Sequence, residues 1–457
     1  MIILALDALI GRERRDYLAA RPRCAALAAA AGQHFPAGVP MHWMRDWPMP
    51  VPLYMQEAQG ATLTDVDGHC YVDFCLGDTG AMFGHSPPAV AHAIAVQAAH
   101  GLTAMLPAAR VSEVGERLAA LFGLPWWQIT QTATDANRAV LRKARMITGR
   151  PRVLVFDRCY HGTVDETMVV MGADGATLPR PGQVGRVHDP EATTVVVEFN
   201  DLPALERALA RGDIACVLAE PVMTNAGMVL PEAGFLEGLR EACSRHDVPL
   251  AIDETHTLSS GFGGYARLHG LAADFLVCGK AIAGGLPCAV YGFSDAIAKR
   301  IGAADAFRES GHSGIGTTLS ANPLAIAALH ASLSEVVTVE NFRLMEARAA
   351  HLEQGILAAF ARHRLTWQVS RVGARLEFVR SPAPRAGRQS VEGLDHDLEQ
   401  AMHLYLLNRG FLLTPFHNMM LSSPVTTAAQ VDAFLSVFDG ALAVFGERMR
   451  QGRVECA

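Results

Sequence analysis

Lysine is scarce in this chain of 457 residues, which contains only Lys143, Lys280 and Lys299. The other 36 of its 39 basic residues are arginine, which does not lose its proton in a protein. A buried lysine can become a neutral nucleophile, so amine chemistry in this chain has three candidates. Positive charge is also not in excess. The formal net charge of −7 offers no basic field, and we expect no nucleic-acid partner.

Paired cysteines and long apolar runs are missing as well. The nine cysteines form no CxxC pair and their number is odd, which predicts a reduced, cytoplasmic chain without a disulfide framework or a metal site. No apolar run approaches the roughly 18–20 residues that span a bilayer, so no membrane association is expected. The opening Met1–Ile10 is apolar, but Asp7 interrupts it and no basic residue precedes it, unlike a signal peptide.

The length predicts more than one lobe, because a single core rarely serves a chain of this size. Half of the residues are hydrophobic and 19% are charged, which favours a folded chain with a sizeable core. We expect three segments. Residues 1–74 would form a helix and a hairpin that belong to a small lobe, 75–335 a large domain, and 336–457 a C-terminal small domain.

Secondary structure follows a regular pattern in the central part of the chain. The segment 12–31 looks helical despite Pro22, and 61–74 alternates apolar and polar residues around Asp67-Gly68, as a hairpin does. Short apolar strands (153–156, 193–199, 214–221, 248–254, 274–280) then alternate with helical segments (88–99, 136–147, 202–211, 233–246, 321–335). This alternation predicts an α/β fold with a mainly parallel sheet and helices on both faces.

The C-terminal part predicts a smaller α+β lobe. Helices are expected at 339–363 and 394–409, with short strands near 366–379 and 411–414 and a loop at 381–393. In sheets of the central type, ligands bind at the carboxyl ends of the strands. The polar residues that end the central strands are therefore the candidates for a site.

Lys280 is the first candidate, because it follows the apolar strand FLVCG and precedes AIAGGLP. Burial disfavours the ammonium form and favours the neutral amine that a Schiff base requires. Gly279, Gly284 and Gly285 would let the backbone approach a ligand closely. The alternative is a lysine at a strand end that reaches solvent, as Lys143 and Lys299 are expected to do.

Asp253 ends the strand VPLAI one strand before Lys280. A carboxylate there can cap a helix, bind a metal or pair with a cationic ring nitrogen. No histidine–carboxylate spacing supports a metal. The neighbouring Lys280 favours the third role, because a carboxylate that keeps a pyridine ring protonated helps pyridoxal 5′-phosphate (PLP) to accept electrons.

Thr132, Ala133 and Thr134 lead directly into a helix. Small and hydroxyl residues at a helix start leave backbone N–H groups for an anion such as phosphate, although most such segments are plain N-caps. Tyr160, in a YHG segment after the strand at 153–156, could cover a ring or be an ordinary loop aromatic.

In this order the segments resemble the class III (ω-type) aminotransferases of PLP fold type I, which include glutamate-1-semialdehyde aminomutase. The resemblance runs from about residue 50 to 435 and rests on eight motifs: DVDG (65–68), GHxxP (84–88), the phosphate turn (132–135), YHG (160–162), EPV (220–222), DE (253–254), GKxxxGGxP (279–287) and TxxxNP (318–323).

The resemblance implies a role for each matching position. Lys280 would be the Schiff-base lysine, Asp253 the partner of the pyridine nitrogen, and Tyr160 the residue stacked on the ring. Thr318 would reach the phosphate of the neighbouring subunit, which implies a homodimer. The remaining cofactor contacts would come from the phosphate turn and from loops after the central strands, at Thr132, Ala133, Thr134, Glu220, Asn225, Thr255 and His256.

The chain departs from the family pattern at several positions. Thr132-Ala133 replaces a serine-glycine pair, Arg158 stands near the place of a glycine, and Thr255-His256 replaces a valine-led sequence. His417 falls where the aminomutase has a pocket glutamate. Asp78, Arg45 and Arg375 are open candidates for contacting substrate, with a turn, surface or ion-pair role as the alternative.

The expected activity is that of an aminotransferase, which moves an amino group between an amine or amino acid and a keto or aldehyde acceptor. The alternatives are an aminomutase of the glutamate-1-semialdehyde type, another PLP enzyme such as a racemase or decarboxylase, or a PLP-fold protein that binds without turnover. The presence of Lys280, Asp253 and Tyr160 together argues against the last.

Overall fold

The computed structural model describes residues 2–186, 189–305, 313–379, 383–391, 395–415 and 417–451. The chain forms two compact units. Unit 1 comprises Met1–Ser86, Arg343–Ala383 and Glu392–Ala457, and unit 2 comprises Pro87–Phe342 and Pro384–Val391. The three-segment division expected from the sequence stays a prediction. Cys456 lies outside the described residues, and the other cysteines are free.

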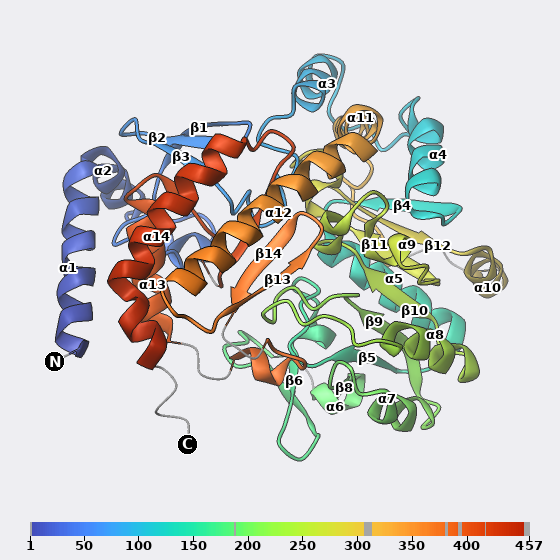
Figure 1. The fold of residues 1–457 in the computed structure, drawn as a ribbon. Coiled ribbons are helices and arrows are strands. Elements are labelled where there is room, and N and C mark those ends of the chain that lie inside the picture. The colour runs from blue at the N-terminus through green and yellow to red at the C-terminus, as the bar shows by residue number, and fades with distance from the viewer. Residues whose placement is uncertain are drawn as a thin grey trace. The chain divides into compact units, whose positions relative to one another are not determined.

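Unit 2 is built on a seven-stranded sheet with the strand order β4-β12-β11-β10-β9-β5-β8. Its strands and helices, drawn in Figure 1, are α3 (Pro88–Ala98), α4 (Val111–Phe122), β4 (Trp126–Thr130), α5 (Ala133–Thr148), β5 (Arg152–Phe156), β6 (Val169–Met171), β7 (Thr177–Pro179), α6 (Pro190–Thr193), β8 (Thr194–Val197), α7 (Leu202–Leu209), β9 (Ile214–Ala219), α8 (Phe235–Arg245), β10 (Leu250–Asp253), α9 (Gly264–Leu268), β11 (Phe275–Cys278), β12 (Ala289–Phe293), α10 (Asp295–Asp305) and α11 (Pro323–Ala331).

The sheet is parallel over most of its width. Strands β8, β5, β9, β10 and β11 run in one direction, which confirms the expected α/β fold with a mainly parallel sheet. The sequence did not predict β4 and β12, and β12 is antiparallel to both of its neighbours. Five-residue segments of this kind cannot be assigned to a strand from periodicity alone.

Helix α5 holds the strands together along one side of the sheet. It contacts β4, β9, β11 and β12, and its buried positions Ala136, Ala139 and Val140 form one stripe along the helix.

A segment from late in the chain, Pro384–Val391, also belongs to unit 2. The backbone amide of Gly387 donates to the carboxylate of Glu198, and Nδ2 of the Asn200 side chain donates to the carbonyl of Arg385.

Unit 1 contains two small sheets, with the strand orders β1-β2-β3-β15 and β13-β14-β16. Its helices and strands are α1 (Ile2–Ala20), α2 (Pro22–Ala31), β1 (Met55–Gln59), β2 (Thr62–Asp65), β3 (Cys70–Asp73), α12 (Val339–Arg362, whose first turn belongs to unit 2), β13 (Gln368–Val372), β14 (Arg375–Val379), α13 (His396–Leu407), β15 (Phe411–Leu412), β16 (Met419–Leu421) and α14 (Ala428–Gln451).

Two local expectations for the N-terminal segment can be compared with the structure. The hairpin is confirmed: β2 and β3 are antiparallel, and Asp65 accepts hydrogen bonds from the amides of Asp67 and His69 in the turn. The single helix expected at 12–31 is wrong. Pro22 begins a second helix, because a proline has no N–H to donate and suits the first position of a helix.

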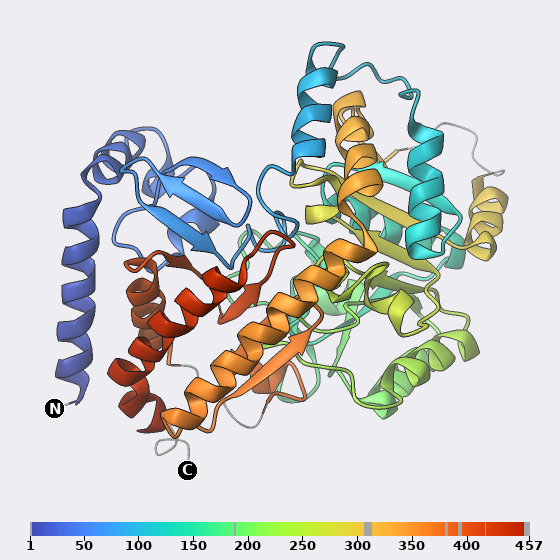
Figure 2. The ribbon, with the colours of Figure 1, turned by 45° about the horizontal axis from the view of Figure 1, so that its top comes forward.

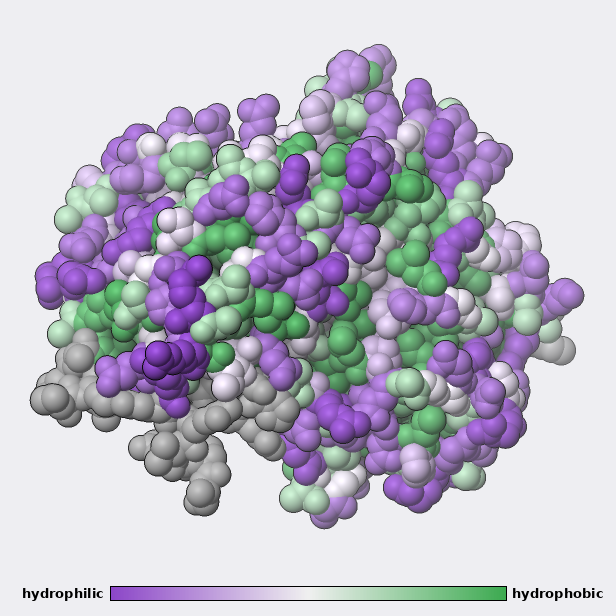
Figure 3. All heavy atoms as spheres, in the orientation of Figure 1, coloured by the Kyte–Doolittle hydropathy of each residue, from purple (hydrophilic) through white to green (hydrophobic). Residues whose placement is uncertain are grey.

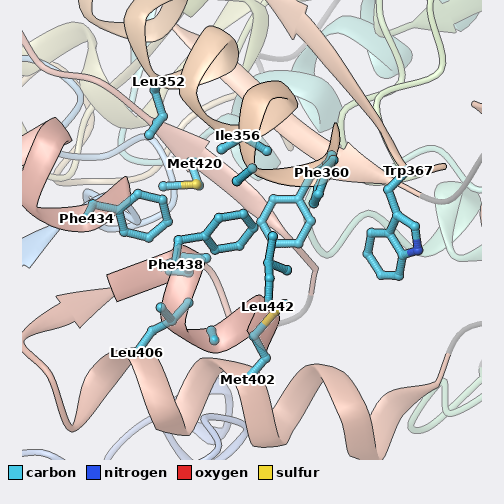
Figure 4. Close-up of a cluster of buried hydrophobic side chains, with 14 of the residues drawn as sticks. Leu352, Ile356, Phe360, Trp367, Met402, Leu406, Met420, Phe434, Phe438 and Leu442 are labelled. Carbon is cyan, nitrogen blue, oxygen red and sulfur yellow. The ribbon is translucent and has the colours of Figure 1, made fainter. Parts of the chain in front are cut away.

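Unit 1 has an aromatic core to which α12, α13 and α14 contribute (Figure 2). In the close-up of Figure 4, Phe438 lies next to Phe360 and Phe434, with Met402 and Leu442 nearby. Ring centroids of Phe438 lie 5.5 Å from those of Phe434 and 5.3 Å from those of Phe378. Such contacts are the edge and offset arrangements that aromatic pairs favour.

Helix α14 is long and apolar enough, by length and composition, to cross a membrane. Core helices meet the same criterion, and its side chains Val431, Phe434 and Phe438 are fully buried in the aromatic core. On the face of the molecule drawn in Figure 3, hydrophobic residues lie scattered among hydrophilic ones. The packing of unit 1 therefore accounts for the apolar character of this helix.

Candidate active site

The candidate residues of unit 2 follow strands that end at one edge of the sheet. Asp253 is the last residue of β10, Glu220 follows β9, and Lys280 comes shortly after β11. Strand β4 has the same direction as β11, because β12 is antiparallel to both. The start of α5, just after β4, therefore lies at the same edge, where ligands bind in open α/β sheets.

Asp253 is a buried carboxylate held by two side chains. Its Oδ2 lies 2.9 Å from Nδ1 of His161 and accepts a hydrogen bond of 2.8 Å from Asn137 Nδ2, and its Oδ1 accepts from the amide of Thr255. Burial by itself would raise the pKa of Asp253, but the hydrogen bond and the charge of His161 outweigh it and lower the pKa to about 2. Asp253 thus stays negative at neutral pH.

His161 is the positive partner in this pair. Burial opposes its protonation, but Cys159 and the hydrogen bond to Asp253 raise the pKa of His161 to about 10. Its Nε2 is buried and has no hydrogen-bond partner in the part of the chain that the structure describes. The sequence did not assign a role to His161 or Asn137, although His161 stands in the YHG motif, because their partner is far away along the chain.

The N-terminus of α5 is the candidate anion-binding part of the site. Thr132 is the N-cap and accepts from the amide of Asp135 at 3.1 Å, so the helix begins at Ala133. Thr134 Oγ1 accepts a hydrogen bond from the amide of Thr163. The first N–H groups and the positive end of the helix dipole suit a phosphate.

Two glycines allow other loops to approach this helix start. A Cβ on Gly162 would lie 2.1 Å from Thr134 Oγ1, and a Cβ on Gly279 would lie 2.9 Å from that of Ala133. Both distances are shorter than real Cβ contacts, so a larger residue would force the loops apart. The close approach of Gly279 brings the residue that follows it, Lys280, near the start of α5.

Lys280 is half-buried and has a left-handed backbone conformation, with φ of 50°. A non-glycine residue in this region is uncommon, and such strain is typical of functional positions. Its Nζ forms a hydrogen bond with Nε2 of His256, which is buried. Lys143 belongs to α5 and Lys299 to α10, both away from the strand ends.

Glu220 and Tyr160 are linked through the backbone. The amide of Tyr160 donates to Glu220 Oε1 at 3.1 Å, and the guanidinium of Arg180 lies 5.9 Å from the centre of the Tyr160 ring. Thr255 Oγ1 is buried and has no hydrogen-bond partner among the described residues. Asn225 is exposed, and its Nδ2 lies 3.2 Å from Nδ1 of His256.

Thr318 lies in an exposed turn before α11. Thr318 does not cap this helix, because Asn322 is the N-cap and accepts from the amide of Ala325 at 2.9 Å. Thr317, not Thr318, contacts Gln131 Oε1, at 3.1 Å. The exposure of Thr318 leaves its expected role toward another subunit as a prediction.

The open substrate candidates belong to unit 1, where they differ in burial. Arg45 is exposed and pairs with Asp46 at 3.6 Å, as a surface arginine does. Arg375 is buried and donates to Thr79 Oγ1. His417 Nδ1 lies 3.1 Å from Glu377 Oε1. Burial lowers the pKa of His417, but Glu377 and Asp78 raise it above its ordinary value.

The residues of unit 2 fit PLP by their chemistry. A helix N-terminus would suit the phosphate, the carboxylate of Asp253 would suit a ring nitrogen, and Lys280 would supply an amine for the aldehyde. Gly162 and Gly279, at which a Cβ would collide with Thr134 and Ala133, keep the start of this helix clear of further side chains. Within the described ranges, no group of three or more metal-binding side chains is found.

The chain belongs to the class III aminotransferase family, whose model ("Aminotransferase class-III") matches residues 44–442. It is an enzyme of PLP fold type I, and its cofactor is pyridoxal 5′-phosphate.

The similar proteins include aminomutases and transaminases. A structure of a glutamate-1-semialdehyde-aminomutase from Pseudomonas aeruginosa is 49% identical to this chain, with a TM-score of 0.94. The match covers 97% of this chain and 99% of that structure's chain. A variant of the same protein has been solved in complex with PMP, with the same identity and coverage. Glutamate-1-semialdehyde 2,1-aminomutase of Roseiflexus castenholzii is 34% identical over 403 residues, 85% of this chain and 92% of the relative. An omega-transaminase structure from Sphaerobacter thermophilus is 27% identical with a TM-score of 0.84 and covers 92% of this chain and 97% of its own.

We predict that Gly162→Ala weakens PLP retention at least tenfold, because its Cβ would displace Thr134 from the start of α5. The matched control is Gly175→Ala. Gly175 has φ of 83°, similar to the 77° of Gly162, but a Cβ there meets nothing within 4 Å. Both variants carry the backbone cost of about 1 kcal/mol. Equal PLP dissociation constants, measured by equilibrium dialysis, would contradict the prediction.

Proposed function

We propose that this enzyme is an aminomutase of the glutamate-1-semialdehyde type, which moves an amino group between neighbouring carbons of one substrate. The observation that carries the proposal is the 49% identity, over nearly the whole of both chains, to the Pseudomonas aeruginosa structure of that name. The Roseiflexus castenholzii relative supports it. The sequence had favoured an aminotransferase and had kept the aminomutase as the alternative.

PLP supplies an electron sink for negative charge that develops on a substrate carbon. We propose that Lys280 holds the cofactor covalently and, when its amine is free, moves a proton at the substrate carbon. Asp253 would face the ring nitrogen and keep it protonated, since this carboxylate stays charged at neutral pH. The start of α5, with Thr132, Ala133 and Thr134, would bind the phosphate.

The remaining expected residues would orient the cofactor ring. Tyr160 would cover one face, and Thr255 the other. Glu220 would support the loop that carries Tyr160, because its carboxylate accepts a hydrogen bond from the backbone amide of Tyr160. Asn225 and His256, 3.2 Å apart at their nearest polar atoms, would lie near the ring edge. These roles remain proposals, supported by the shared position of the residues at the strand ends.

Amino transfer between two molecules is the second candidate, and His417 favours it. The resemblance implies a pocket glutamate at this position in the aminomutase, whereas this chain has a histidine beside Glu377. A small-molecule amine donor and a keto or aldehyde acceptor would then be the substrates. For either reaction we propose a cytoplasmic location.

The two candidates predict different stoichiometries. Supplied with glutamate-1-semialdehyde alone, an aminomutase should convert it completely to the isomer with the amino group on carbon 1, without an external acceptor. An aminotransferase should instead consume an amine and pyruvate or 2-oxoglutarate in equal amounts. We expect the first result, measured by chromatography of substrate and isomer. Turnover only with an external acceptor would overturn the proposal in favour of amino transfer.

We predict that borohydride reduction of the PLP-loaded enzyme places the pyridoxyl group on the peptide that contains Lys280. Lys280→Ala should still bind PLP but lose turnover by several orders of magnitude, since it removes both the covalent link and the group that moves the proton. Lys143→Ala is the matched control and should keep both label and activity. A pyridoxyl group found on Lys143 or Lys299 would disprove the assignment.

We also propose a homodimer in which Thr318 reaches the phosphate of the other subunit. Mixed dimers of Thr318→Ala and Lys280→Ala chains test this. If Thr318 acts across the interface, one site of the mixed dimer carries both defects and the other carries none, so activity above either parent should return after subunit exchange. If Thr318 acts within its own chain, every site keeps one defect and no activity returns. The Thr318→Ala parent is expected to show impaired PLP retention.

A further inference from the structure

His256 connects Lys280 to a chain of buried polar groups. Its Nε2 bonds to Lys280 Nζ, and on the other side of the ring its Nδ1 lies 2.6 Å from Thr224 Oγ1. Thr224 Oγ1 in turn donates to Glu220 Oε2 at 2.8 Å. The side chains of His256, Thr224 and Glu220 are all at least nine-tenths buried, so this chain of bonds is shielded from water.

The donors around Glu220 determine the polarity of the chain. Its oxygens accept from the amide of Tyr160, and from the amide and hydroxyl of Thr224. A carboxylate accepts at both oxygens, whereas a protonated carboxyl would have to donate one bond. Burial raises the pKa of Glu220 above its ordinary value, while the bonds from Thr224 and Tyr160 act in the opposite direction. The donor arrangement fits the ionised form.

This polarity specifies the histidine tautomer. When Glu220 is ionised, the Thr224 hydroxyl donates its one proton to Glu220, and its oxygen then accepts the proton on His256 Nδ1. Nε2 of the neutral ring is then an acceptor, directed at the amine of Lys280. The side-chain amide of Asn225 also lies 3.2 Å from His256 Nδ1. With its oxygen and nitrogen exchanged by rotation of the amide group, Asn225 accepts a hydrogen bond from the same Nδ1.

We propose that His256 is a positioning residue for Lys280: held in one tautomer by Thr224 and Glu220, it accepts a hydrogen bond from the amine of Lys280 and sets its direction. This inference deepens the proposed function, on which it rests for the role of Lys280. It assigns a purpose to the Thr255-His256 sequence, which departs from the family pattern, and adds Thr224 to the site.

Other charges near this chain form their own pairs. Asp253 pairs with His161, at 2.9 Å. Glu254 is turned toward the start of α9, where its oxygens accept from the amides of Tyr265 and Ala266 at 3.0 and 2.6 Å. The bonded path from Lys280 to Glu220 is therefore the feature to perturb, with these neighbours left in place.

Competitive acetylation of the full chain without cofactor tests the proposal. Acetic anhydride reacts with neutral amines, and mass spectrometry of the peptides gives a separate rate for each of the three lysines. Lys143 and Lys299 serve as internal references for folding and reagent. The rate is measured from pH 6 to 10 for the parent, for the matched pair Thr224→Val and Thr224→Ser, for Glu220→Gln, and for the double variant Thr224→Val with Glu220→Gln.

If the chain of bonds keeps the amine of Lys280 directed at His256 Nε2, breaking the chain should free the amine to react. We expect Thr224→Val to raise the labelling rate of Lys280 at pH 7 about tenfold, the equivalent of one lost hydrogen bond. Glu220→Gln should do the same, and the double variant should add nothing beyond either single change, because both break one path. Thr224→Ser keeps the hydroxyl and should stay within twofold of the parent.

Several outcomes would overturn the proposal: equal rates for the valine and serine variants, slower labelling in Thr224→Val or Glu220→Gln, or effects that multiply in the double variant. Should one variant fail to fold, seen as faster labelling of Lys143 and Lys299, the other single variant decides by the same criterion. The test needs no turnover. If the labelling result contradicts the role of His256, the borohydride mapping of Lys280 still stands as a separate test of the proposed function. If that mapping fails instead, the labelling rates still show whether His256 positions the amine.

Discussion

The buried ion pair between Asp253 and His161 is the interaction on which the rest of the site depends. A carboxylate enclosed at the end of a strand would ordinarily take up a proton, because burial disfavours charge. His161 and Asn137 offset that cost at 2.9 and 2.8 Å. His161 comes from the loop after β5 and Asn137 from α5. Their bonds to Asp253 therefore connect that loop and that helix to the end of β10.

Close backbone approach is the second constraint. The end of β11, the loop after β5 and the start of α5 can meet only where Gly279 and Gly162 stand, since a Cβ at either position would collide with Ala133 or Thr134. The same approach places Lys280 near the positive end of a helix. The absence of two side chains thus brings the start of α5 and the amine of Lys280 together.

The departures from the family pattern fall into two kinds. Arg158 adopts a φ of 67°, a conformation that glycine would adopt more readily, and its loop meets Gly387 from late in the chain. His256 instead introduces a new polar contact, with Lys280 on one side and Thr224 on the other. The first departure is a strained backbone conformation, whereas the second changes the surroundings of the Lys280 amine.

Local sequence determined the strands β5, β8, β9, β10 and β11, the hairpin at Asp67-Gly68, and the identity of Lys280 and Asp253 as residues that follow apolar strands. These features depend on periodicity, turn residues and chain order. Sequence alone could not identify β4 and β12 as strands, the break at Arg21, or the partners His161, Asn137 and Thr224. Those depend on which loops meet at the sheet edge, and a hydrogen bond between residues 24 to 116 positions apart leaves no periodic signal in the chain. Tertiary packing alone decided them, because it brings together side chains whose spacing along the sequence is arbitrary.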